Sequence, residues 1–299
     1  MGTIIIRGLQ TLAVALAALF SVSLVRNAKA NKERVSKTNP ILIFFVQGIT
    51  MFFDTLGIGA YAPQTAIWKL FKMVPDKLIP GTLNVCSLIP QCCEALIFIA
   101  IVKVDPVTLL TLVLCCAVGS NIGARIVGKL PEKTIQLVFG IGLLIVAGIM
   151  VLRQIGVWPA GGEAIGLAGF KLVVSAVLFF LLGICTACGI GAYAPMMAVC
   201  YSFGMSPRAA FPILFSSYTL LMPTSGFQFL KDNNYDIKVA LIGQVAGTIG
   251  VLLAAFLVKE LPIYILTWLI VVVLVYTSIT MFVSAFKKKS AAEPEAVAE

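Results

Sequence analysis

The heptapeptide Gly-Ile-Gly-Ala-Tyr-Ala-Pro occurs twice in this chain, at residues 57–63 and again at residues 189–195. The likeness continues downstream, at an offset of 132 residues and then, after a one-residue slip, of 131. The matching pairs are Ala66 with Ala198, Phe71 with Phe203, Met73 with Met205, Pro75 with Pro207, Pro80 with Pro212, Asp105 with Asp236, Gly119 with Gly250, Leu130 with Leu261 and Pro131 with Pro262. Because a repeat implies that one structural unit is used twice, the sequence predicts two related halves of about 110 residues each.

The composition places these halves in a membrane. Hydrophobic residues make up 60% of the chain and charged residues 12%, and the mean hydropathy is +1.03. Such values lie outside the usual range of soluble domains. Most of the apolar runs are long enough to cross a hydrocarbon layer of about 30 Å as helices; they lie near 9–25, 80–102, 107–125, 134–152, 170–188, 210–230, 239–258 and 262–286. We therefore expect an all-α polytopic membrane protein.

Five segments follow from the repeat and from the polar stretches between the runs. They are an N-terminal transmembrane helix with a basic loop (1–39), repeat 1 (40–152), a linker (153–169), repeat 2 (170–286) and a disordered tail (287–299). The first segment could instead be a cleaved signal peptide, because Ala28-Lys29-Ala30 resembles a cleavage site. Arg26 lies between the apolar run and that site, so we favour an additional transmembrane helix.

The segments 41–56 and 63–74 leave two topologies open, because the second is too short to span the membrane. If the two form a broken hairpin that enters and leaves on one side, each half has three full crossings and the halves are inverted. If they count as one crossing, the halves are parallel. The inverted arrangement places sixteen of the 22 Lys and Arg residues on one side, whereas the parallel one splits them thirteen to nine. The positive-inside bias therefore favours inverted repeats in the plasma membrane, with the C-terminus in the cytoplasm.

The repeated motif suits an anion site at the tip of each hairpin. Proline fits the first turn of a helix, and glycines let the backbone approach a ligand closely. A helix N-terminus carries roughly half a positive charge and favours anions. Two such tips near the bilayer midplane would form a substrate site between the halves, as in inverted-repeat transporters. The predicted substrate-binding residues are Gly57, Gly59, Ala60, Tyr61, Pro63, Gly189, Gly191, Ala192, Tyr193 and Pro195. Further polar candidates are Thr65, Asn84, Ser216, Ser217 and Thr219.

Packing is the alternative explanation of the motif, because small residues are common where membrane helices cross. Duplication with proline at the same point in both copies favours the site. Asp54 and Glu94 have no acidic counterpart in the second half, where Thr186 and Gly226 occupy the aligned positions. Acidic groups inside a membrane are candidates for function, and removal from water favours the protonated carboxyl that proton coupling needs.

Other features indicate what the chain does not do. Histidine is absent, so His-ligated metals, haem and His-based catalysis are excluded; we expect no metal, no cofactor and no enzymatic activity. The eight cysteines lie in apolar segments and are predicted to pack as small hydrophobes. The net charge of +9 reflects loops between spans, so no nucleic-acid partner is expected. Asp105 and Asp236 each precede an apolar run and are predicted to be helix N-caps.

The two glycine-rich breaks, each followed by proline and by a Phe-x-Met-x-Pro-x4-Pro stretch, resemble the sulfite exporter TauE/SafE family of permeases. The closest likeness lies in residues 54–59 and 204–212, and it extends over roughly residues 40–286. The resemblance implies a carrier of small anions such as sulfite or organosulfonates, with proton coupling. Ala60-Tyr61 and Ala192-Tyr193 stand where many members carry glycines, so the substrate could differ from sulfite. We therefore expect a secondary active transporter, with an anion channel on the same hairpins as the alternative; a homodimer is compatible with the sequence.

Overall fold

The computed structural model describes residues 2–127, 129–157, 162–189, 191–257 and 263–286. Within these ranges the fold is all-helical and contains no strand, apart from an isolated bridge between Ala164 and Met205. The predicted all-α membrane class is confirmed. The helices are α1 (Gly2–Ala30), α2 (Pro40–Thr55), α3 (Tyr61–Leu70), α4 (Ile79–Cys86), α5 (Leu88–Ile101), α6 (Pro106–Val127), α7 (Glu132–Gln154), α8 (Gly169–Ala187), α9 (Tyr193–Ser202), α10 (Pro207–Lys231), α11 (Ile237–Leu257) and α12 (Ile263–Phe286), with 3-10 turns η1 (Lys32–Arg34) and η2 (Asp76–Leu78).

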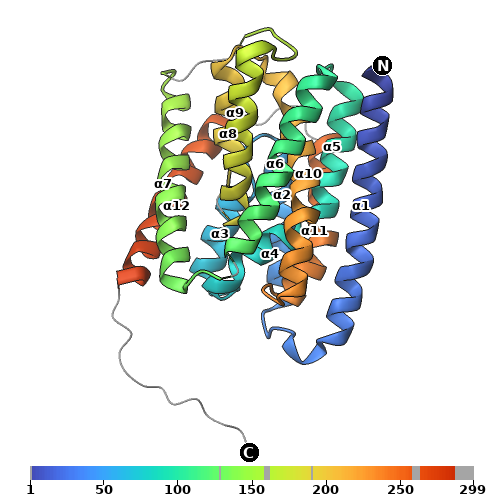
Figure 1. Cartoon of the computed structure of the whole chain (residues 1–299). Coiled ribbons are helices and arrows are strands. Elements are labelled where there is room, and N and C mark those ends of the chain that lie inside the picture. The colour runs from blue at the N-terminus through green and yellow to red at the C-terminus, as the bar shows by residue number, and fades with distance from the viewer. Residues whose placement is uncertain (1, 128, 158–161, 190, 258–262, 287–299) are drawn as a thin grey trace, which may run out of the picture.

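The helices stand side by side in one bundle, with α1 at one edge and the pair α7 and α12 at the other (Figure 1). Packing between the halves is reciprocal: α2 of the first half lies against α11 of the second, and α8 of the second lies against α6 of the first. The first helix of each half therefore packs against a helix of the other half, so the halves do not form two separate bundles.

Glycines at equivalent positions form the two main crossings. A Cβ at Gly119 in α6 would lie 2.0 Å from the Phe180 carbonyl oxygen in α8, and a Cβ at Gly250 in α11 would lie 2.0 Å from the Gly48 carbonyl oxygen in α2. Gly119 pairs with Gly250 in the sequence repeat, and Phe180 lies 132 residues after Gly48. Small residues at these points let the backbones touch, which is how helices associate in lipid.

The predicted hairpins are present as α2–α3 and α8–α9. The sequence placed the first at 41–56 and 63–74, and its helices span 40–55 and 61–70. In Figure 1, α3 lies towards the end of the bundle that holds the loop between α1 and α2, whereas α9 lies at the opposite end. The hairpins therefore approach the middle of the bundle from opposite ends. The inverted relation between the complete halves stays a prediction.

Four helices of the described chain are long and apolar enough to cross a membrane: Ile4–Ala30, Pro106–Val127, Gly169–Ala187 and Ile237–Phe256. The Gly169–Ala187 span is α8, so this arm of the second hairpin is itself of spanning length. The other predicted crossings near 134–152, 210–230 and 262–286 are helical, as α7, α10 and α12.

The apolar run near 80–102, which was expected to cross the membrane, is helical but interrupted. This segment consists of α4 and α5, which are bent by 41° at Ser87 and would form a fifth span only if they are counted together. Pro90 has no N–H to donate back along the helix, which favours a break at this point. Gln244 of α11 bridges the break, because its side-chain N–H donates to the Val85 carbonyl at 2.6 Å and its side-chain oxygen accepts from the Ile89 N–H at 2.7 Å.

The N-terminal helix is packed against α10, α5 and α6. Phe20 is completely buried and its ring meets Phe227 edge-on at 5.2 Å. Asn27 accepts a hydrogen bond of 2.6 Å from the Tyr235 hydroxyl. This helix is therefore an integral part of the bundle core, whereas the predicted disordered tail at 287–299 lies outside the described residues.

The predicted caps are confirmed. The Asp105 carboxylate accepts from the Thr108 N–H at 2.8 Å at the start of α6, and the Asp236 carboxylate accepts from the Val239 N–H at 2.9 Å at the start of α11. The linker is docked rather than free: the Ile165 carbonyl accepts from the Asp105 N–H at 2.9 Å. It therefore ties the beginning of the second half to the α6 cap.

Candidate functional site

Each hairpin tip is a short reversal between two helices. Gly57 and Gly59 have φ angles of +95° and +90°, and Gly189 has a φ of +84°. These left-handed conformations are readily available to glycine and disfavoured for other residues. The second arms begin at Tyr61 and Tyr193, so the two motif prolines fall at the third residue of α3 and of α9, within the first turn. The glycine–proline motif thus ends one helix and starts the next, as its composition predicts.

The two tips pack against each other in a reciprocal way. A Cβ placed on Gly59 would lie 3.0 Å from the Tyr193 Cβ, and one on Gly191 would lie 3.4 Å from both the Tyr61 Cβ and the Ala62 nitrogen. The tyrosine of each motif therefore covers a glycine of the other. Residues 132 positions apart in the chain meet at one point inside the bundle.

A small cavity lies at this junction. Its volume is about 10 Å³ for water-sized spheres, which is room for about one water molecule. Residues from both tips line it, together with one residue each from α2, α7 and α10: Asp54, Ile58, Gly59, Ala60, Tyr61, Ala62, Pro63, Met150, Gly191, Tyr193, Ala194 and Tyr218. The cavity is too small for a multi-atom anion, so the structure represents a closed arrangement of the tips.

Six of the ten substrate-binding residues predicted from the sequence line this cavity: Gly59, Ala60, Tyr61, Pro63, Gly191 and Tyr193. The other four are Gly57, Gly189, Ala192 and Pro195. A Cβ on Gly57 would meet the Phe211 ring at 3.3 Å, so this glycine faces an aromatic side chain of α10 instead. The structure therefore brings the two motif copies together but gives their residues different surroundings.

The Asp54 carboxyl group accepts a hydrogen bond from a backbone N–H of the first tip. Its side chain is buried at the end of α2, and its Oδ1 accepts from the Ala60 N–H at 2.6 Å. Its Oδ2 accepts a hydrogen bond from the Gln91 side chain in α5. The sequence predicted that backbone N–H groups of the tip would be available to an anion. In this closed arrangement, one of them is already bound by the protein's own carboxyl group.

Glu94 lies beside Asp54. It is completely buried in α5, and its Oε1 accepts from the Thr55 hydroxyl at 2.6 Å. The Glu94 Oε2 is buried and has no hydrogen-bond partner among the described residues. The structure thus brings together the two acidic residues that sequence reasoning singled out separately.

Aromatic side chains close the site on the α10 side. The rings of Tyr61 and Tyr218 meet edge-on at 5.3 Å. The Tyr61 hydroxyl has no hydrogen-bond partner among the described residues. An unpaired hydroxyl that is buried at the cavity wall is a donor available to a ligand.

The further polar candidates differ in their surroundings. Asn84 is occupied, because it accepts from Ser225 at 3.0 Å and donates to the Pro80 carbonyl at 2.8 Å. Thr219 donates to the Gln91 carbonyl at 2.9 Å. The hydroxyls of Thr65, Ser216 and Ser217 are buried without a partner in the described part of the chain.

Sequence reasoning missed the glutamines around the site. Gln91 binds Asp54, and Gln64 in α3 donates to Gln47 at 2.6 Å and to Thr50 at 2.9 Å in α2. The two hydrogen bonds of Gln64 join α3 to α2, the two arms of the first hairpin. A signal was present, because Gln91 lies one helical turn before Glu94 on the same face of α5.

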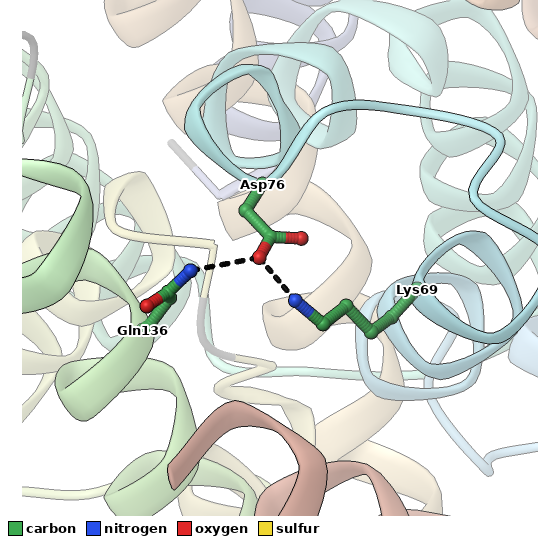
Figure 2. Close-up of polar contacts among 3 residues, drawn as sticks. All are labelled: Lys69, Asp76 and Gln136. Carbon is green, nitrogen blue, oxygen red and sulfur yellow. Dashed lines mark hydrogen bonds and ion pairs between the residues drawn. The ribbon is translucent and has the colours of Figure 1, made fainter. Parts of the chain in front are cut away.

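An ion pair anchors the outer end of the first hairpin (Figure 2). Lys69 near the end of α3 pairs with Asp76 of η2, and the same carboxylate oxygen accepts from the Gln136 side chain of α7 at 3.0 Å. The second arm of the hairpin is therefore fastened to α7 at the end remote from the cavity, while its tip contacts the other hairpin.

A helical membrane bundle with two opposed, broken hairpins meeting at a buried polar junction has the architecture of a polytopic membrane transporter. The family model described as Sulfite exporter TauE/SafE matches residues 3–150. Over this range, which is about half of the chain, the sequence matches this family, as the repeated motifs indicated. Members of the family are transporters and not enzymes, and the match implies a multi-pass membrane protein that moves sulfur-containing anions.

The matched range differs from the predicted one. It includes α1, which sequence reasoning left outside the resemblance, and it ends with the first half of the chain. No curated protein matches the chain, and no solved structure does.

Proposed function

We propose that this protein is a secondary active transporter of small sulfur oxyanions or sulfonates that binds its substrate between the two hairpin tips. The observation that carries the proposal is the reciprocal contact of Gly59 with Tyr193 and of Gly191 with Tyr61. Two helix N-termini from opposite ends of the bundle converge there, and each favours negative charge. The site needs no buried lysine or arginine.

The closed cavity supports alternating access rather than a permanently open pore. With room for about one water molecule, the junction conducts no anion as it stands. Substrate enters when one hairpin moves away from the other, and it leaves on the other side when the second hairpin moves. Inverted repeats make such an exchange possible, because each half can adopt the conformation of the other.

Proton coupling follows from the contact between Asp54 and the Ala60 N–H. The ionised Asp54 carboxylate repels a second anion and holds a donor that the substrate would use. A proton delivered to the Asp54–Glu94 pair removes the charge and weakens the acceptor, so that the Ala60 N–H becomes available. Binding of the proton therefore favours binding of the anion, and the two cross together.

The transport reaction is tested with purified protein in proteoliposomes. Uptake of labelled sulfite is measured with and without a pH gradient, in the presence of sulfate, thiosulfate and small sulfonates as competitors. The proposal expects saturable uptake that follows the gradient and is inhibited by at least one competitor. Fast, unsaturable flux that is independent of the gradient would identify a channel. Absence of both flux and competition would refute a sulfur-anion substrate.

Site variants separate binding from coupling. Gly59→Val and Gly191→Val place a branched side chain at the tip contact and are expected to abolish transport in protein that still inserts into the membrane. Asp54→Asn keeps an oxygen acceptor for the Ala60 N–H but cannot titrate. We expect this variant to retain anion exchange between equal pools and to lose accumulation driven by a pH gradient. Gradient-driven accumulation equal to that of the wild type would rule out Asp54 as the coupling group.

The orientation belongs to the same proposal. The basic loops around residues 26–37, 69–77 and 125–133 lie on the cytoplasmic side of the plasma membrane, and the C-terminus lies there too. Cysteine labelling of a single engineered loop site in intact cells tests this placement. Reaction of a loop cysteine near residue 129 with an impermeant reagent would contradict it.

A further inference from the structure

We propose that the protein carries a binding site for one anionic phospholipid, separate from the hairpin junction, with the headgroup at Lys37 and Lys72 and an acyl chain between α2 and α11. The proposal is independent of the transported substrate. It rests on a cavity, on a lysine in an unusual backbone conformation and on an apolar groove along the same helix pair.

The headgroup cavity lies at the end of the bundle that holds the loop between α1 and α2. Its volume is about 640 Å³, and the two lysines line it together with apolar side chains such as Leu42 and Phe71. Among the described residues, neither lysine has an ion-pair partner, whereas Lys69 nearby is paired with Asp76. Two unpaired ammonium groups above an apolar wall are complementary to an amphipathic anion.

The backbone of Lys72 indicates that the lysine is there for its side chain. Its φ is +50°, in the left-handed region that L-residues rarely adopt. The equivalent residue of the second half, 132 positions later, is Gly204, with a φ of +88°. The same turn is thus built with glycine where no side chain is needed. A non-glycine residue in such a conformation is a reason to look for function.

Among the described residues, one carboxylate lines this cavity, and it is already hydrogen-bonded. Asp236 caps α11, where it accepts from the Val239 N–H at 2.9 Å, and it accepts from the Ser36 hydroxyl at 3.1 Å. The wall itself is fixed, because Lys238 donates to the Thr38 carbonyl at 2.7 Å. The cavity therefore keeps its shape and presents its positive charge to a ligand.

A separate apolar groove lies along the same helix pair, between α2 and α11. It has a volume of about 490 Å³ and is lined by aromatic and aliphatic residues of α2 and by residues of α11. Leu42 of the cavity and Phe45, Ile49 and Phe52 of the groove are spaced three and four residues apart, so they share one face of α2. Phe45 and Ile49 are more than half exposed on this face. A charged pocket at the helix ends and an apolar groove below it match the two parts of a phospholipid.

The test uses the purified full-length chain in detergent. Delipidated protein is titrated with phosphatidylglycerol, with phosphatidylcholine and with inorganic phosphate, and the melting temperature and retained lipid are measured. The proposal expects saturable stabilisation by phosphatidylglycerol only. Removal of both charges by Lys37→Gln with Lys72→Gly is expected to weaken its apparent affinity by about tenfold to thirtyfold. Lys72→Gly suits the backbone, so a loss of affinity cannot be ascribed to strain.

Controls distinguish the occupants. Lys72→Arg should retain the affinity. Lys77 is an exposed lysine in η2 outside the cavity, so Lys77→Gln should not change the affinity. Ile49→Ser in the groove should weaken binding, whereas Ile122→Ser on α6 should not.

Three results would overturn the proposal. Inorganic phosphate that stabilises as well as phosphatidylglycerol would indicate a free-anion site. A groove variant that changes the oligomeric state and leaves lipid affinity unaltered would indicate a second copy of the chain on this face. If phosphatidylglycerol and phosphatidylcholine bind the wild type equally well, and the double lysine variant binds them with the same affinity, the charge of the headgroup plays no part in binding.

Discussion

Gly119→Ala tests whether backbone contact at the α6–α8 crossing holds the two halves together. The new Cβ would lie 2.0 Å from the Phe180 carbonyl oxygen, whereas ordinary contacts begin at 3.4 Å, so the helices must separate by the difference. Overpacking of this kind costs about 1–3 kcal/mol, and the upper end applies here because the obstacle is backbone. The better helix propensity of alanine offsets about 1 kcal/mol. We therefore expect a net loss of about 2 kcal/mol.

The assay is equilibrium unfolding of the purified protein in mixed detergent micelles, followed by tryptophan fluorescence and circular dichroism. Gly250→Ala at the equivalent α11–α2 crossing should cost a similar amount, because its Cβ would also lie 2.0 Å from a carbonyl oxygen. Gly148→Ala in α7 is the matched control, since its Cβ would meet nothing within 4 Å. It should be neutral or stabilising. If Gly119→Ala is as stable as Gly148→Ala, the reasoning from close backbone contact is wrong.

Three further predictions concern the tips, the bend and the N-terminal helix. Gly59→Ala should destabilise the protein by about 1–2 kcal/mol, because its φ of +90° is costly for alanine, whereas Gly191→Ala should be nearly neutral; equal melting temperatures would contradict this. Gln244→Leu removes both partners from the break between α4 and α5 and should cost about 2–5 kcal/mol, with hydrogen exchange increased at Ile89; unchanged exchange would show that the bridge is not needed. Phe20→Ala should reduce the free energy of unfolding by about 3–5 kcal/mol and increase proteolysis of α1; cleavage of α1 at the wild-type rate would contradict this.

The sequence was most informative where the physical cause is local. Hydropathy located the helices, and the glycine–proline motif located the reversals, because chain conformation at those positions depends on neighbouring residues. The cap at Asp105 followed in the same way, since a carboxylate just before a helix bonds to the first-turn N–H groups whatever the tertiary structure.

The features that the sequence did not predict depend on residues that lie far apart in the chain. Proline alone did not predict the bend at Ser87, because α10 continues through Pro212 and Pro223 without a break. The backbone groups at the break are hydrogen-bonded by Gln244, which lies more than 150 residues away from Val85 and from Ile89 in the chain. The hydrogen bond between Thr55 and Glu94 was likewise out of reach, since it depends on how α2 packs relative to α5.

The chemical difference between the two hairpins has a consequence for energetics. The position of Asp54 in the first half is taken by Thr186 in the second, so only one of two similarly built tips carries a charge that responds to pH. In the proposed cycle, the inward-open and outward-open conformations are then unequal in free energy, and their ratio varies with proton concentration. The duplication gives the two hairpins similar backbones, and the difference between Asp54 and Thr186 makes one of the two open conformations more stable than the other at a given pH.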